Sequence, residues 1–92
     1  MSFEQTARET LTNLLTIHSP TGYHQEVMAY IKDTLDHLEV PYIQTVKGAV
    51  LATLQGEEKE GRLFSAHVDT LGAMVKSIKG KGTLTFTLIG GY

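Results

Sequence analysis

The sequence predicts an α+β fold, part of an α/β layer, in which two N-terminal helices are followed by about five strands. Apolar residues recur at helical spacing in the N-terminal part of the chain. After Pro41 the pattern changes to short β-type runs, and turns containing glycine separate these runs. A length of 92 residues suits one compact domain, so residues 1–92 are expected to form a single unit.

The first helix is expected to begin after Ser2 and to stop before Pro20. Ser2 can cap the helix, and Gln5 three residues later can reach back to complete a capping box. Proline disfavours the α conformation at the preceding residue, Ser19, which sets the end of the helix. The apolar stripe of this helix comprises Phe3, Ala7, Leu11, Leu14 and Leu15.

A second helix is expected between the Thr21-Gly22 turn and Val40-Pro41, where proline ends it. Its apolar residues recur at helical spacing, and charged residues lie off that stripe, as on a solvated face. The stripe comprises Val27, Ile31, Leu35 and Leu38, and the charged face comprises Lys32, Asp33, Asp36 and Glu39.

Five strands are expected after the helices, over residues 42–46, 49–54, 62–67, 73–78 and 83–88. The uncharged interior of the third, Leu63 to Ala66, is typical of a central strand covered on both faces. The fourth and fifth form a hairpin around Lys79-Gly80-Lys81-Gly82. In the fifth, leucine and phenylalanine alternate strictly with threonine, which is the clearest strand signal in the chain.

Composition excludes several classes of function. The net charge is −2, from ten acidic and eight basic residues, which is too small and too well mixed for a nucleic-acid partner. The absence of cysteine excludes disulfides, thiolate zinc sites and a cysteine nucleophile. The polar N-terminus lacks a signal-peptide core, and no stretch approaches the ~20 apolar residues of a membrane span. A cytoplasmic protein without a membrane partner is therefore expected.

His67 and Asp69 form the candidate site for chemistry, in the stretch SAHVDTLG. Residues at i and i+2 of an extended segment point to the same side, and these two follow the predicted third strand. In open α/β sheets, ligands bind outside the carboxyl ends of the strands. A neutral imidazole suits Zn, Co or Mn, and a nearby carboxylate can orient it. On spacing alone an incidental polar strand end is the more common explanation, so both interpretations stay open.

Other catalytic classes lack their residues. There is no Gly-x-Ser-x-Gly elbow and no phosphate-binding Walker loop. A carbohydrate hydrolase needs two carboxylates across a cleft, and Glu57, Glu58 and Glu60 lie in one polar loop instead. The other histidines, His18, His24 and His37, are expected at exposed positions on or at the ends of the helices.

Several motifs together resemble the N-terminal part of the M42 family of metallo-aminopeptidases, which includes glutamyl and leucyl aminopeptidases. They are Ser19-Pro20-Thr21-Gly22-Tyr23, the stretch Ser65 to Val75, and the closing hairpin that ends in Ile89-Gly90-Gly91-Tyr92. Their order and distances match the family over nearly the whole chain. The related M20 peptidases share the His-x-Asp-Thr element but are not expected to continue into this hairpin.

The resemblance implies an enzyme that removes N-terminal residues from peptides with two divalent metal ions, Zn, Co or Mn. It implies that His67 is a metal ligand and that Asp69, the catalytic carboxylate, orients this ligand. About residues 1–72 would then belong to the catalytic domain, and the hairpin of about residues 73–92 would begin an inserted β domain. The complete protein is expected to be a homo-oligomer.

Two positions depart from the family pattern. Thr70 stands where many members have a glutamate, which bears on specificity, and Gly48-Ala49 stands where many have Gly-Asn. Family members are also several times longer, and their remaining metal ligands and general base come later. This segment alone is therefore expected to be inactive. The alternative from another class is a non-catalytic α+β module that binds a partner or self-associates.

Overall fold

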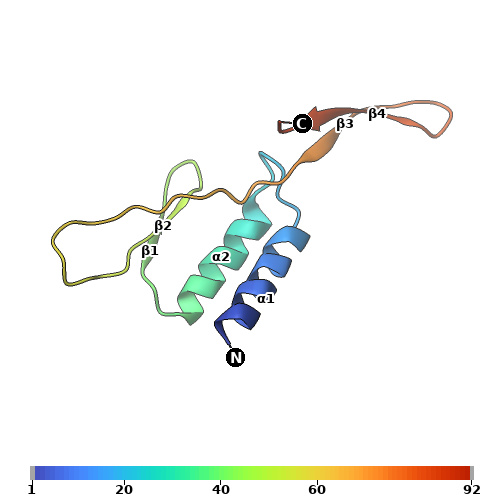
Figure 1. Ribbon diagram of the computed structural model, residues 1–92. Helices are drawn as coiled ribbons and strands as arrows, with labels where there is room; N and C mark the ends of the chain where they lie inside the picture. The colour runs from blue at the N-terminus through green and yellow to red at the C-terminus, as the bar shows by residue number, and fades with distance from the viewer. Residues whose placement is uncertain (1, 92) are drawn as a thin grey trace.

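The computed structural model describes residues 2–91 and has an α+β fold. Helix α1 (Phe3–Thr16) and helix α2 (Gln25–His37) lie side by side and run in opposite directions (Figure 1). Strands β1 (Tyr42–Gln44) and β2 (Val50–Ala52) form a small ribbon beside α2. Strands β3 (Gly72–Ile78) and β4 (Leu84–Ile89) form a second hairpin, which extends away from the helices.

The predicted start of α1 is confirmed. Gln5 N donates to Ser2 Oγ at 3.2 Å, and Ser2 N donates to Gln5 Oε1 at 3.1 Å, which completes the capping box. The helix ends at Thr16, before the proline, as expected. One side-chain hydrogen bond joins the two helices, from Asn13 Nδ2 to Tyr30 Oη at 3.1 Å.

Helix α2 carries the small core of the described residues. Val27 is fully buried and Met28 is 8% exposed, and these two are the buried apolar side chains of residues 2–91. The helix ends at His37, three residues before the predicted limit. Glu39 then adopts a left-handed φ of 57°, a conformation that a helix cannot continue.

Both two-stranded sheets are antiparallel. The turn that connects the strands contains a glycine with positive φ in each, Gly48 (97°) in the first and Gly82 (79°) in the second. The second hairpin starts and ends within a residue of the prediction. Its register places Phe86 opposite Val75 and Leu88 opposite Ala73, so the predicted apolar face of β4 continues onto β3.

The predicted third strand is wrong. Residues 62–67 adopt no strand, and Leu63 and Phe64 are 80% and 91% exposed. A strand requires a neighbouring backbone to receive its hydrogen bonds, and no described strand pairs with this segment. The uncharged composition of this segment shows that it could be buried, which favoured a covered strand. Composition does not provide the neighbouring strand with which it would have to pair.

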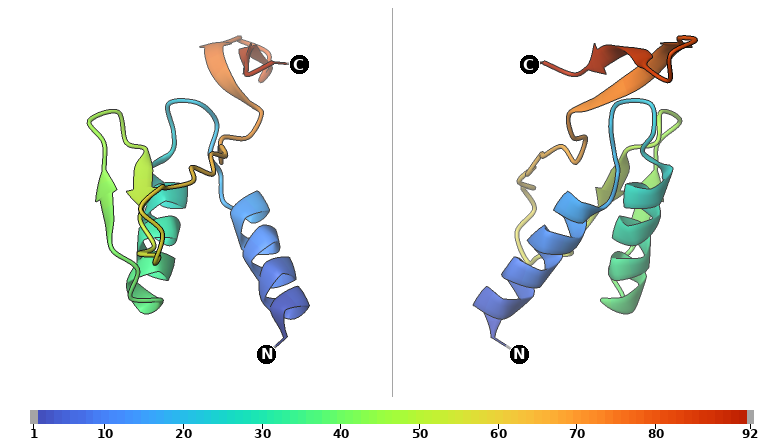
Figure 2. Two further views of the ribbon diagram at one scale, coloured as in Figure 1. Left: turned by 60° about the vertical axis from the view of Figure 1, so that its left-hand side comes forward. Right: turned by 90° about the vertical axis from the view of Figure 1, so that its right-hand side faces the viewer.

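The molecule is elongated and open (Figure 2). Its radius of gyration is 17.6 Å, whereas a compact chain of this length has about 12 Å. Its accessible surface is 8276 Å², compared with roughly 5,300 Å² for a folded protein of this mass. Much apolar surface therefore faces solvent. No helix within residues 2–91 is long and apolar enough to span a membrane.

Candidate functional site

His67 and Asp69 contact each other directly. The distance from His67 Nδ1 to Asp69 Oδ1 is 2.8 Å. An ionised carboxylate can only accept, so Nδ1 of the neutral imidazole carries the proton and donates it to this bond. The other ring nitrogen, Nε2, then has its lone pair available. An imidazole held in this tautomer by a carboxylate is the arrangement that commonly supports a metal-bound histidine.

The surroundings of this pair differ from the prediction. The expected same-side placement holds, but the residues lie in an irregular segment rather than at the end of a covered strand. The His67 side chain is 84% exposed and that of Asp69 is 50% exposed. The strand-end crevice that the sequence indicated is therefore absent from the described part of the chain.

Ser19 holds the backbone on both sides of Asp69. Its hydroxyl donates to the carbonyl oxygen of Val68 at 2.8 Å, and its own carbonyl accepts from Thr70 N at 2.9 Å. Ser19 is fully buried, and no other polar or charged residue among residues 2–91 is buried. Pro20 and Thr70 form an isolated parallel β-bridge that continues the contact. These bonds join the segment after α1 to the segment that carries the candidate site.

Gly72 permits a close approach in the same region. A Cβ atom added at Gly72 would lie 2.6 Å from Cβ of Pro20, which is well inside van der Waals contact. The Pro20 atom belongs to a rigid ring, so it cannot swing aside. The chain thus packs two neighbouring residues, Ser19 and Pro20, against the five residues from Val68 to Gly72.

The described residues can supply part of a metal site. No group of three or more His, Asp or Glu side chains within residues 2–91 is placed to hold an ion. His67 fits the role of one ligand, because its Nε2 is available and its tautomer is set by Asp69. A catalytic zinc ion normally has three protein ligands, so these residues do not complete a site by themselves.

The other histidines lie elsewhere. His18 is exposed in the segment after α1. His24 was predicted to be an exposed helix residue, but it precedes α2 as its N-cap, is half-buried and lies against Gly48. His37 ends α2 and hydrogen-bonds through Nδ1 to the carbonyl oxygen of Asp33 at 2.8 Å. That bond and the nearby Asp33 charge raise the pKa of His37 above its usual 6.5.

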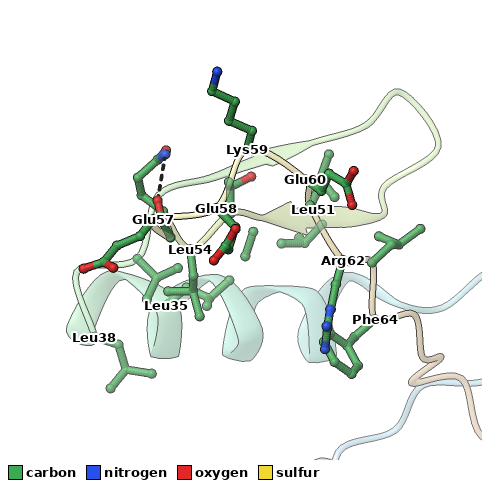
Figure 3. Close-up of a pocket in the computed structure, with 18 residues that line it drawn as sticks. Leu35, Leu38, Leu51, Leu54, Glu57, Glu58, Lys59, Glu60, Arg62 and Phe64 are labelled. Carbon is green, nitrogen blue, oxygen red and sulfur yellow. Dashed lines mark hydrogen bonds between the residues drawn. The ribbon is translucent and has the colours of Figure 1, made fainter.

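A hollow among the described residues lies away from this pair. A cavity of about 900 Å³ opens between α2, β2 and the segment that follows β2 (Figure 3). Leu35 and Leu54 line it from the helix and the segment, whereas the Lys59 side chain points outward. Neither His67 nor Asp69 lines this cavity. Glu57, Glu58 and Glu60, all on one polar loop, are the carboxylates among its lining residues.

Sequence reasoning missed Ser19. The residue stood out as the end of a helix before proline and as the first residue of the Ser19–Tyr23 motif, and neither gave it a role, whereas its partners are about 50 residues further along the chain. The sequence does show a serine between a helix and a Pro-x-Gly turn. No neighbouring residue indicated which group its hydroxyl would contact. Tyr92, the last residue of the closing motif, lies outside the described residues.

Comparisons with known proteins agree with the motifs. A family model described as M42 glutamyl aminopeptidase matches residues 48–92, the part that contains the His67–Asp69 pair. The protein named "Putative aminopeptidase YhfE" of Bacillus subtilis (strain 168) is 46% identical over 85 residues. That alignment covers 91% of this chain and 25% of the relative, so the chain spans about a quarter of the relative's length.

Proposed function

Because the chain belongs to the M42 peptidase family, we propose that the complete protein is a metal-dependent aminopeptidase that removes N-terminal residues from peptides. The observation that carries this proposal is the 2.8 Å contact between His67 Nδ1 and Asp69 Oδ1. It leaves Nε2 of an exposed imidazole available in the tautomer that a metal ligand requires. Peptides are the substrate class that the family implies.

His67 would hold a divalent ion through Nε2, and Asp69 would fix the ring orientation and increase its basicity. The ions, two per complete site and drawn from Zn, Co or Mn, supply Lewis-acid activation of water and of the peptide carbonyl when bound. The remaining ligands would come from other parts of the complete protein. The 92-residue chain by itself is accordingly inactive, since it provides one imidazole and one orienting carboxylate.

Hydrolysis of an aminoacyl-p-nitroanilide by the complete gene product tests this proposal. We expect activity that a chelator abolishes and that added Zn, Co or Mn restores. His67→Ala should lower kcat/KM by more than about 100-fold, because losing an outer partner of a ligand already costs about 10–100-fold. His37→Ala is the matched control, since His37 is also exposed with its Nδ1 bonded. Equal activity in both variants would refute the proposed role of His67.

The complete protein is also proposed to be a cytoplasmic homo-oligomer. The absence of cysteine from these 92 residues is compatible with a reducing compartment. The exposed apolar surface of this chain is compatible with association between copies.

A second candidate function, a non-catalytic self-association module, is favoured by the apolar face of the β3–β4 hairpin. The side chains of Leu84, Phe86 and Leu88 are each more than half exposed, and register aligns Val75 with Phe86. An isolated two-stranded hairpin is marginally stable, so covering this face would stabilise it. Sedimentation of the 92-residue chain tests this function. Association that Phe86→Lys abolishes and Thr87→Lys, on the other face, leaves intact would support it, whereas a monomer at all concentrations would refute it.

A further inference from the structure

The His67–Asp69 contact needs support from the surrounding backbone. Both side chains are at least half exposed. An ion pair or charge-assisted hydrogen bond in such a position contributes little, because water competes for both partners and two side chains must be ordered. The segment that carries them lies in no helix or strand. The contact alone is therefore too weak to hold the ring and the carboxylate in one arrangement.

Resting on the proposed function, we propose that Ser19 is a positioning residue for the metal ligand His67. Ser19 bonds to Val68, which lies between His67 and Asp69, and to Thr70, which follows Asp69. These are the two residues that flank the orienting carboxylate. Fixing both peptide groups restricts the backbone of Asp69, and so it directs the Asp69 side chain toward Nδ1 of His67.

Burial makes this support effective. Ser19 is fully buried, whereas the pair that it positions is exposed. A buried hydrogen bond is costly to break, because the donor or acceptor left behind has no water to replace its partner. Ser19 is therefore shielded from the water that competes for the imidazole and the carboxylate, and its partners Val68 and Thr70 are half-buried. Pro20 extends this support by the parallel bridge to Thr70 and by its contact with Gly72.

The test uses the metal-free 92-residue chain and reads the tautomer of His67 from the ¹⁵N chemical shifts of its imidazole nitrogens. At a pH where the ring is neutral, the chain should favour the Nδ1–H form. Ser19→Ala keeps the backbone carbonyl but removes the hydroxyl bond to Val68. We expect the ratio of Nδ1–H to Nε2–H to fall about twofold to fivefold, the range of an exposed contact.

Thr34→Ala is the matched control, because the Thr34 hydroxyl also donates to a backbone carbonyl at 2.8 Å, that of Tyr30, within α2. It should leave the ratio of His67 unchanged. An unchanged ratio in Ser19→Ala, or an equal fall in Thr34→Ala, would overturn the inference. If Ser19→Ala unfolds the chain, Gly72→Ala tests the same contact between the two segments while the Ser19 hydroxyl is kept. It should lower the ratio as well, and an unchanged ratio there would overturn the inference.

This readout needs no metal and no catalysis, so it separates the two proposals. Loss of the tautomer preference in Ser19→Ala supports the positioning role whatever the metal content of the complete protein. Retention of metal and activity in the His67→Ala variant of the complete protein would refute the proposed function. The tautomer ratio measured for His67 in the 92-residue chain would still stand. In the complete enzyme, a positioning role predicts that Ser19→Ala lowers kcat by a similar twofold to fivefold while KM stays close to its original value.

Discussion

Replacing Gly72 by alanine should separate the two segments that meet at Ser19. The added Cβ would lie 2.6 Å from Cβ of Pro20, whereas ordinary contact begins at about 3.4–4 Å. The segments must therefore move apart by roughly 1 Å. If that movement lies along the Ser19 Oγ–Val68 bond, its 2.8 Å length becomes about 3.8 Å, which is beyond hydrogen-bonding distance. Overpacking of this kind costs about 1–3 kcal/mol.

Hydrogen exchange at the Thr70 amide measures this separation, because Thr70 N donates to the Ser19 carbonyl at 2.9 Å. Losing one hydrogen bond of about 0.5–1.5 kcal/mol should accelerate exchange about twofold to twelvefold. Gly80→Ala is the control, since no atom lies within 4 Å of a Cβ added there. If Thr70 exchanges at the same rate in Gly72→Ala as in Gly80→Ala, the proposed packing of these segments is refuted.

Three further predictions follow from the site and the helices. Asp69→Asn in the complete protein should weaken metal affinity about 10–100-fold, as measured by competition with a chelating dye, and unchanged affinity would contradict its orienting role. The 92-residue chain with Zn, Co or Mn should release no p-nitroaniline, whereas metal-dependent release would contradict the proposed incompleteness of its site. The pKa of His37 is raised when folded, so its stabilising contribution is present below pH 6.5 and is lost as the pH rises through the folded pKa. Titration of His37 by NMR should give a value above 6.5 that Asp33→Asn lowers while the bond to the residue 33 carbonyl is kept, and an unchanged value would contradict the contribution assigned to the Asp33 charge.

Local signals predicted the local structure. The capping box at Ser2, the end of α1 before Pro20 and the alternating strand β4 depend on residues close together in the sequence, and each is present in the structure. The same holds for His67 and Asp69, whose spacing of two residues was enough to predict that they face the same side.

Features that depend on distant partners could not be predicted. The strand expected over residues 62–67 requires a neighbouring strand, and a composition that suits burial does not show where that strand would come from. The stripe of α1 has the expected period, yet Leu11 and Leu15 are 56% and 66% exposed because little packs against them. The hydrogen bond from Ser19 to Val68 spans 49 residues, and no periodicity or motif encodes such a pairing.

The central claim is that His67 ligates a metal ion in the complete protein, and metal stoichiometry tests it most directly. The complete gene product, His67→Ala and His37→Ala would be purified in parallel with the same metal supplied, and their bound metal counted by inductively coupled plasma mass spectrometry. We predict that His67→Ala loses at least one ion per chain while His37→Ala keeps the full complement. Equal metal content in all three proteins would contradict the claim.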